Sequence, residues 1–550
     1  MGFLGTRDTV ASDVRAGVTL GVESIPDGLA SGLLAGVNPA YGLYAYLVGT
    51  AAGALATSSV FMSVQATGAM SVIVADVPIL HSGAQATTAL FTLSVLTGVV
   101  MLLLGLLRLG TLVRFVPNAV LTGFVNAVAV NIVLGQLSNL TGWSSSAGNR
   151  VTRSIDTLLH PGQWSWASVL VGVATVVLIL VLERTPVGAL GLVVAVVVTS
   201  GGTALLGLDG VTTLDDVAQV PSTLPSFSMP DLSLAGSLLV PALSLALVGL
   251  VQGAGISNSV PNPDGRYPDP SGDFRGQGVA NIAAGLFQGM PVGGSMSATA
   301  IVTSAGARSR LANLAAGVVM AVLILVLGST LGHIARPALA GLLVLIGVRA
   351  FRLDNVLDVW RTGPTQATTM AVTFALTLLI PLQYAVLVGV GLSILLYVFA
   401  QSSKVTLTSW TVDEQGRMIE GPVPPELPPH EVVVLQPYGS LFFAAAPVLE
   451  TQLPQATASS TGSVVILRLR GKQELGSTFI AVVRRYRAQL DAAGSRLYLA
   501  GVSDRVRRQL DATRATDELG EDAVFLATPA VHESVQAAVA HAEDWVRAQR

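Results

Sequence analysis

Long apolar runs separated by short polar turns follow one another along residues 1–403. A bilayer core about 30 Å thick needs roughly 20 helical residues to cross it. Runs of spanning or half-spanning length lie near 14–35, 39–56, 66–77, 85–107, 115–137, 165–183, 187–207, 236–260, 278–290, 295–305, 311–332, 337–350, 366–382 and 384–402. The pattern predicts an α-helical polytopic membrane protein with fourteen spans.

Two of these runs, 66–77 and 295–305, are too short to cross the bilayer and are candidate half-helices. The stretch before the second has the proline, glycines and hydroxyls of a surface loop, although apolar runs flank it. In hydrocarbon, open backbone is tolerated only where protein covers it or where it lines a wet cavity. We expect an extended piece from Pro291 to Gly294 and a short helix from about Ser295. An ordinary re-entrant hairpin or a packing kink is the alternative.

The stretch 63–70 repeats this chemistry in the first half of the chain. Hydroxyl and β-branched residues lead to Thr67 and Gly68, and the short helix that follows ends before Pro78. The first amides of a helix are free and stand at the positive end of its dipole, so a helix start binds anions. Two starts aimed at one another would concentrate positive potential in one cavity. The sequence therefore predicts an anion site near mid-membrane that needs no cationic side chain.

Polar and small residues at these two starts are the candidates for binding the anion. Taken singly, each polar side chain is as well explained by a hydrogen bond between helices. Taken as a set at two helix starts, they indicate a binding site. The predicted substrate-binding residues are Gln65, Thr67, Gly68, Gln288, Gly294, Ser295, Met296 and Ser297.

Glu23 is a carboxyl group inside the first predicted span. A charged carboxylate at the centre of a membrane helix costs about 3 kcal/mol, and such residues usually face a cavity or relay protons. Glu23 is therefore the candidate for proton coupling. The alternative places it near the membrane surface, or bonded to a turn broken at Pro26. We expect Asp27, which follows that proline, to be a helix cap or an interfacial residue.

Arginine positions predict the orientation of the spans. With an even number of spans and the N-terminus inside, twelve arginines of the membrane part face the cytoplasm. Only Arg150, Arg153 and Arg336 face outward, and the loop 208–235 carries acids but no base. This asymmetry follows the positive-inside rule. It predicts a multi-pass membrane protein with both termini in the cytoplasm.

Charge divides the chain into two parts. Hydrophobic residues make up 51% of the whole, and the mean hydropathy is +0.65. Residues 1–403 hold 15 Arg and Lys and 16 Asp and Glu, whereas the much shorter segment 404–550 holds 15 and 17. A membrane domain is therefore followed by a soluble domain.

Segment 404–550 alternates short apolar runs with amphipathic helix patterns. The predicted strands are 432–435, 441–444, 464–469, 497–500 and 524–526, and the predicted helices are 447–454, 476–492, 503–512 and 530–548. Such alternation is typical of a sheet covered by helices. Proline-rich residues 422–429 form either a stiff spacer or an early loop of this domain.

A weak internal echo suggests that the membrane part is duplicated. Leu109 to Arg114 and Leu331 to Arg336 share the pattern Leu-Gly-x-x-x-Arg, each before a proline and a further apolar run. In the predicted topology the first copy is inside and the second outside, as an inverted repeat of seven plus seven spans requires. The two half-helices are then the third span of each half.

The chain contains no signature of an enzyme. It has no cysteine, no His/Cys cluster for a metal, no phosphate-binding glycine loop and no nucleophile motif in a credible context. We expect no cofactor and no catalysis, so an ion gradient or the gradient of the substrate supplies the energy. The net charge of −3 and the lack of a basic patch give no indication of nucleic acid as a partner.

The chain resembles the SulP family of anion transporters and exchangers along nearly its whole length. The membrane motifs that carry the resemblance are 278–281, 285–297 and 304–308. The end of the chain is similar to a STAS domain, through 441–444, 464–470 and 499–502. Within the family, the chain is most similar to bacterial members that take up fumarate together with protons.

This resemblance implies a seven-plus-seven inverted repeat in a transport domain, residues 1–403, followed by a cytoplasmic STAS domain, residues 404–550. It implies a core of spans 1–4 and 8–11 that moves against a gate of spans 5–7 and 12–14, with the substrate between the half-helices. It also implies a homodimer. Many relatives carry an acid at the position of Gln252 and some an arginine at Ala298, so a sodium site and a fixed cation are not expected here.

Together these features predict a secondary-active anion transporter. The missing cation and the presence of Glu23 favour proton symport of a dicarboxylate such as fumarate. An uncoupled exchanger of bicarbonate, sulfate or chloride, an anion channel, and a sensor that signals through its STAS domain are the alternatives.

Overall fold

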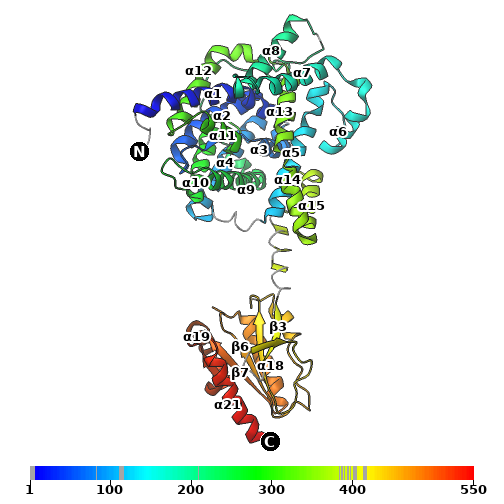
Figure 1. Cartoon of the computed structure of the whole chain (residues 1–550). Coiled ribbons are helices and arrows are strands. Elements are labelled where there is room, and N and C mark those ends of the chain that lie inside the picture. Colours follow the sequence, from blue (N-terminus) through cyan, green and yellow to red (C-terminus); the bar gives the residue numbers. More distant parts are fainter. Residues whose placement is uncertain are drawn as a thin grey trace. The chain divides into compact units, whose positions relative to one another are not determined.

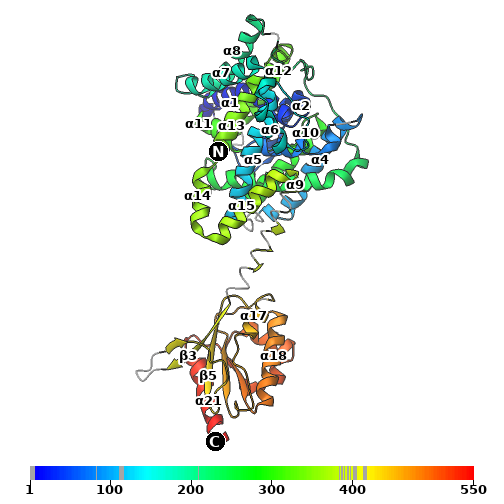
Figure 2. The ribbon, with the colours of Figure 1, turned by 90° about the vertical axis from the view of Figure 1, so that its right-hand side faces the viewer.

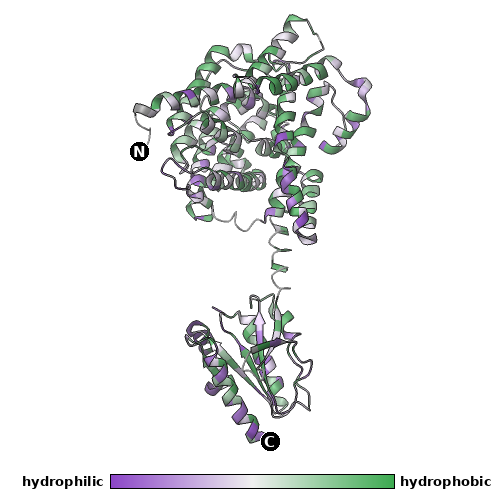
Figure 3. Cartoon of the chain, in the orientation of Figure 1, coloured by the Kyte–Doolittle hydropathy of each residue, from purple (hydrophilic) through white to green (hydrophobic). Residues whose placement is uncertain are grey.

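The computed structural model describes residues 7–81, 83–110, 117–208, 210–382, 405–412, 418–441 and 443–550, with scattered positions between 383 and 404. The chain forms two compact units, residues 1–393 and 394–550 (Figures 1 and 2). Apolar residues dominate the helices of the first unit, whereas the second mixes polar and apolar residues (Figure 3). The two units are described separately below.

Helices stand at every predicted span before 384–402; of that last span only scattered residues are described, and those residues are helical. They are α1 (Arg7–Leu34), α2 (Pro39–Ala56), α3 (Gly68–Ala75), α4 (Ala86–Leu106), α5 (Asn118–Thr141), α7 (Trp166–Leu182), α8 (Gly191–Leu205), α9 (Ala235–Ser259), α10 (Pro270–Leu286), α11 (Met296–Ser304), α12 (Leu311–Leu331), α13 (Arg336–Ala350) and α15 (Pro364–Leu379). Among the described helices, α4, α5, α9 with the turn before it, and α12 are long and apolar enough to cross a membrane by length and composition.

The structure departs from the predicted spans in two respects. Helix α10 begins at Pro270, eight residues before the predicted start at 278, because its first turns carry polar side chains that hydropathy excludes. Asp273 in those turns is buried and accepts hydrogen bonds from Ser58 and Ser257. The structure also has two amphipathic helices that were not predicted, α6 (Arg150–Leu159) and α14 (Leu353–Thr362). Of the internal echo, residues 111–114 lie outside the described part.

The helices of the first unit pack in two groups. In one group α4 packs on α10, α1 on α12, and α2 on both α10 and α12. In the other, α5 packs on α13 and α15, and α7 packs on α8 and α13. Helices α4 and α10 approach closely at Gly98, where any side chain would clash, since a Cβ there would lie 2.5 Å from the backbone oxygen of Gly278. The groups meet where α1 touches α13 and α8, and where α3 touches α5.

The second unit is a six-stranded sheet with the order β4-β3-β5-β6-β7-β8. Its strands are β3 (Thr406–Val412), β4 (Met418–Gly421), β5 (Val432–Tyr438), β6 (Val464–Arg468), β7 (Arg496–Val502) and β8 (Val524–Leu526). Strands β5 to β8 are parallel, and β3 runs antiparallel to both β4 and β5. Residues 422–429 lie between β4 and β5, so they form a loop inside the domain.

Helices cover both faces of this sheet. Helices α17 (Ala446–Glu450) and α18 (Ser477–Ala492) bury Leu449 and Phe479 against one face, and α21 (Glu533–Gln549) buries Ala538 against the other. The helical membrane domain with an α/β domain after it is thus confirmed. The predicted strand 441–444 is wrong, because the described residues there form a turn before α17. The side chain of Leu441, at the start of this turn, is buried.

Candidate functional site

Two short strands join the starts of the half-helices. Strand β1 (Ser63–Gln65) precedes α3, and β2 (Gly293–Ser295) precedes α11. The strands pair antiparallel, with Ser63 opposite Ser295 and Gln65 opposite Gly293. This pairing brings together two stretches from opposite halves of the membrane unit. The extended piece, the short helix after it and the proximity of the two helix starts agree with the prediction from sequence.

A hydroxyl residue caps each half-helix. The Thr67 Oγ1 atom accepts a hydrogen bond from the Met70 N–H at 3.4 Å, and the Ser295 Oγ atom accepts one from the Ala298 N–H at 3.3 Å. The amides between each cap and its bonded N–H have no carbonyl within the helix to donate to. They stand at the positive ends of two helix dipoles. The described residues of β1, β2, α3, α9 and α11 include no charged side chain.

Side chains of α10 satisfy the open backbone before α11. The Asn281 amide donates to the Val292 carbonyl at 2.6 Å, and its oxygen accepts from the Val292 N–H at 2.9 Å. The Gln277 Oε1 atom accepts from the Gly294 N–H at 2.9 Å. Gly294 therefore supplies no free amide, and a Cβ there would lie 3.0 Å from Ile256. Sequence analysis missed this role of Asn281 and Gln277, because their partners depend on how α10 packs.

Gln65 connects β1 to two neighbouring helices. It is 2% exposed, and its Nε2 atom donates to Ser24 Oγ at 2.9 Å and to Thr50 Oγ1 at 3.2 Å. This is the hydrogen bonding between helices that the alternative interpretation described. In contrast, Met296 and Ser297 in the first turn of α11 are exposed, and the Ser297 hydroxyl lies 3.2 Å from that of Ser295.

Gln252 of α9 lies beside the first half-helix start. Its Oε1 atom accepts a hydrogen bond from Thr67 Oγ1 at 3.0 Å. Gln252 was not among the predicted binding residues, although a polar amide within an apolar span was a usable signal. On another side of this start, a Cβ at Gly68 would lie 2.7 Å from Ile132 of α5. An apolar side chain from the second helix group therefore packs against Gly68.

The structure does not place Gln288 with the other predicted residues. It follows the end of α10 with a positive φ of 57°, and its Oε1 atom accepts a hydrogen bond from the Ser226 N–H. The extended segment that contains Pro291 separates it from the start of α11. In the same loop as Ser226, the Ser228 N–H donates to the Leu286 carbonyl. Gln288 thus holds the loop between α8 and α9, and its assignment to the half-helix starts is corrected.

Glu23 lies inside α1 and is 4% exposed. Its Oε2 atom is buried and has no hydrogen-bond partner among the described residues. Helix α1 continues through Pro26, so a turn broken at that proline is not present. Asp27 is likewise inside α1 and caps no helix, contrary to the sequence expectation. Its Oδ1 atom is also buried without a partner in the described part of the chain.

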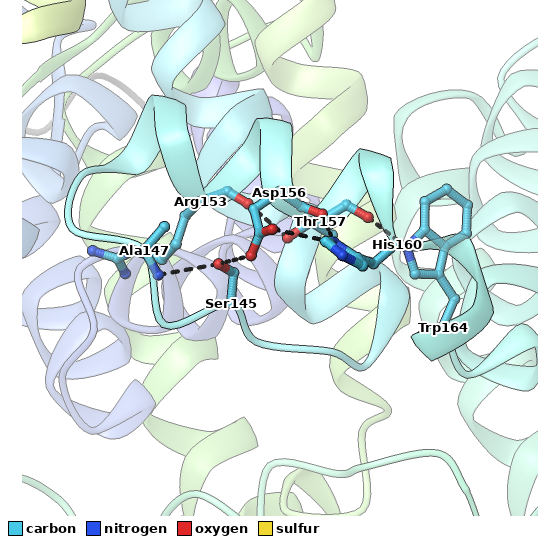
Figure 4. A network of polar contacts seen from close by, with 7 residues as sticks. All are labelled: Ser145, Ala147, Arg153, Asp156, Thr157, His160 and Trp164. Carbon is cyan, nitrogen blue, oxygen red and sulfur yellow. Dashed lines mark hydrogen bonds and ion pairs between the residues drawn. The ribbon is translucent and has the colours of Figure 1, made fainter.

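A separate polar network lies within residues 145–164, the segment that contains α6 and links α5 to α7 in the chain (Figure 4). Asp156 accepts a hydrogen bond from the Ser145 hydroxyl, and its Oδ1 atom lies 3.1 Å from His160 Nδ1. The Trp164 indole donates to the Thr157 carbonyl at 2.8 Å. Ser145 donates to the carboxylate and not to the imidazole, so this is not the nucleophile and base arrangement of a hydrolase. No group of three metal-binding acids or histidines occurs among the residues described.

Known protein families match both units of the chain. Residues 10–373 match the Sulfate permease family, and residues 425–538 match the STAS domain. YbaR of Bacillus subtilis, which is named for sulfate transport, is 29% identical over 413 residues, or 74% of this chain and 81% of YbaR.

Two solved structures share the fold. The structure of SLC26A9 superposes with a TM-score of 0.86 at 17% identity, covering 99% of this chain and 91% of that one. The transmembrane domain of a cyanobacterial bicarbonate transporter, BicA, superposes with a TM-score of 0.58 at 21% identity, covering 71% of this chain and 98% of that one. At these identities the likeness establishes the fold alone. The family match spans well over half of the residues, and the chain therefore belongs to the sulfate permease family, with a STAS domain after its membrane part.

Proposed function

We propose that this protein is a secondary-active transporter that moves a small divalent anion across the membrane together with protons. One observation carries the proposal. The antiparallel pair of β1 and β2 brings the starts of two half-helices together, with free amides at each. Membership of the sulfate permease family supports transport of an anion. The paired starts supply the place where the anion would bind.

The proposed site holds its anion with dipoles and hydroxyls. Helix starts stabilise negative charge through their first N–H groups, without a cationic side chain. Ser295, Ser297 and Thr67 add hydroxyls, and Gln252 adds a side-chain amide. The proposed binding residues are Gln65, Thr67, Gly68, Gln252, Gly294, Ser295, Met296 and Ser297, where Gln65 and Gly294 shape the site through their own hydrogen bonds.

A proton on Glu23 would offset the charge of the anion. Because the carboxyl of Glu23 is buried without a partner, it is costly to keep charged. It is linked to the site through its neighbour, since Ser24 accepts a hydrogen bond from Gln65 of β1. A protonated Glu23 would let a dianion enter a site that has no fixed cation.

The substrate we propose is a dicarboxylate such as fumarate, and sulfate is a divalent alternative. Sulfate is favoured by the name of YbaR. Dipoles select charge and size more than chemical identity, so the two anions must be separated by measurement. Uptake would proceed by movement of the first helix group against the second, in a homodimer of the bacterial inner membrane with both termini in the cytoplasm.

Uncoupled exchange of a monovalent anion such as bicarbonate is a second candidate. One of the solved structures that share the fold is the transmembrane domain of a protein named as a bicarbonate transporter. Exchange would be indifferent to a proton gradient, because the charge of one anion replaces that of the other. Symport and exchange therefore differ in whether anion uptake responds to a proton gradient.

Reconstitution into liposomes tests these proposals. Uptake of radiolabelled fumarate, sulfate, bicarbonate and chloride is measured with and without an inward proton gradient at a clamped membrane potential. We expect uptake of a divalent anion that follows the gradient and that falls sharply in Glu23→Gln. Counterflow of anion against anion that ignores pH would favour the exchanger. An unchanged response in Glu23→Gln would remove Glu23 from the mechanism.

A further inference from the structure

We propose that Glu23 and Asp27 together form the proton site, each carrying one proton, so that two protons cross the membrane with each divalent anion. This inference rests on the proposed function and specifies its stoichiometry. Asp27 becomes a second proton-carrying residue, in place of the cap or interfacial residue expected from sequence. Two protons and one dianion carry no net charge, so transport is electroneutral.

The first argument is the geometry of α1. Residues four positions apart on a helix lie on the same face, with Cβ atoms about 6 Å apart. Glu23 and Asp27 have this spacing, and α1 is continuous between them. One carboxyl oxygen of each is buried and has no hydrogen-bond partner among the described residues. Asp27 is only partly buried, whereas Glu23 is 4% exposed.

The second argument is that the elements packed against α1 offer, in their described residues, no cation that pairs with either carboxylate. The elements packed against α1 are α2, α3, α5, α8, α11, α12, α13 and the turn Gly188–Leu190. The titratable side chains on the described residues of these elements are Tyr41, Tyr44, Tyr46, Arg336 and Arg349. The two arginines stand at the ends of α13 and are engaged elsewhere.

Those engagements are specific. Arg349 binds the Glu183 carboxylate at 2.8 Å, and Arg336 donates to the Asn139 side chain at 2.6 Å. Glu183 is the other carboxylate within electrostatic range of Glu23, and it is already paired. The Tyr46 hydroxyl lies 3.2 Å from that of Ser31, so it too has a partner.

Protonation of both carboxyls would remove the cost of the buried, unpartnered oxygen on each of them. Two carboxylates at this spacing repel one another, and a buried charge without a partner is strongly unfavourable. Each carboxylate forms one O–H bond with a proton from the side where the anion enters. Each O–H bond breaks on the opposite side, where the anion and both protons are released. No electron transfer or covalent bond to the anion is required.

The test measures proton stoichiometry in liposomes that contain the full chain. Radiolabelled sulfate and fumarate are brought to zero net flux against an imposed pH gradient, with the membrane potential clamped at zero. Each proton per anion contributes about tenfold accumulation per unit of pH gradient. We expect about 100-fold accumulation for the natural chain, about tenfold for Glu23→Gln and for Asp27→Asn, and none for the double variant. In the single variants, an inside-negative potential then opposes uptake.

Two further variants control the comparison. Asp354→Asn removes an exposed carboxylate on α14 and should keep the 100-fold accumulation. Asp27→Glu keeps the carboxyl and should show the 100-fold accumulation. It tests the role of this carboxyl even where Asp27→Asn folds poorly. Accumulation of 100-fold in Asp27→Asn, or of only tenfold in the natural chain, would refute the proposal that Glu23 and Asp27 each carry one proton. Anion counterflow at equal pH is measured in parallel, since its absence for every anion would refute the proposed function itself.

Discussion

Thr67 donates its hydroxyl hydrogen to Gln252 Oε1 at 3.0 Å, and so ties the first half-helix to α9. The same oxygen of Thr67 accepts the Met70 N–H as the cap of α3. One hydroxyl thus orients Gln252 and helps to define the helix start. Loss of that hydroxyl would disturb both elements that we propose contact the anion.

We expect Thr67→Val to raise the KM for anion uptake about tenfold, which corresponds to one lost hydrogen bond of about 1.4 kcal/mol. Thr67→Ser keeps the hydroxyl and should stay close to the natural chain. Thr303→Val, near the end of α11, removes a hydroxyl that bonds only its own helix and serves as a matched control. Equal KM values for Thr67→Val and Thr303→Val would contradict the assignment of Thr67 to the site.

Asn281 should be required for the fold around α11. It is fully buried and bonds both the N–H and the carbonyl of Val292. Asn281→Leu leaves both backbone groups unpaired, at a cost of about 3 kcal/mol. Thermal unfolding of the detergent-solubilised chain measures this loss. Asn258→Leu, an exposed position near the end of α9, should change the unfolding temperature little. A stable Asn281→Leu variant would show that other groups hold the extended segment.

An ion pair holds the C-terminal end of the first half-helix. Asp76 follows α3 and binds Arg150 of α6 at 2.9 Å, and its second oxygen accepts the Leu382 N–H. Both side chains are about one fifth exposed, so the pair is partly screened. A double-mutant cycle with Asp76→Asn and Arg150→Gln should give a coupling of about 1 kcal/mol in thermal unfolding.

The exposed pair of Asp544 and Arg547 in α21 is the reference for that cycle. Its coupling should be near zero, because both side chains are largely in solvent. A similar coupling for the two pairs would mean that Asp76 and Arg150 add nothing beyond a surface contact.

Stability of the STAS domain should depend on pH through Glu450. Two hydrogen bonds from Arg485 hold the pKa of Glu450 below its ordinary value. A carboxyl whose pKa is lowered by folding stabilises the folded state at pH values above its ordinary pKa. This stabilisation is lost as the pH falls through the lowered, folded-state pKa. Arg485→Gln should therefore destabilise the domain at pH 7 and have little effect once the pH lies below the lowered pKa of Glu450.

Hydrogen exchange of the α17 and α18 amides in the full chain measures this difference. Arg508→Gln removes an exposed charge from α19 (Asp504–Ala512) and should show no such pH dependence. An equal effect of Arg485→Gln at both pH values would indicate that the arginine stabilises by packing alone.

The sequence by itself determined most of the membrane helices and the buried parallel strands of this protein. Run lengths located the helices, and proline, glycine and hydroxyl residues between apolar runs located the half-helix of Ser295. The short runs around Thr67 showed the matching feature, since local composition sets where a helix starts and stops. Strands buried in the STAS sheet were predictable for the same reason. Strand β3 and the turn at Leu441 were not, because a short apolar run has no period that separates strand from turn.

Only the tertiary structure decided which side chains meet. Gln288 and Gln252 are both polar amides beside apolar runs, yet one bonds the loop at Ser226 and the other bonds Thr67. That the Asp27 Oδ1 atom has no hydrogen-bond partner among the described residues could not be predicted either. Hydrogen-bond partners lie up to 306 positions apart in the chain, and their distances depend on how whole helices pack. Hydrophobic pattern specifies each helix, whereas packing specifies the contacts between helices.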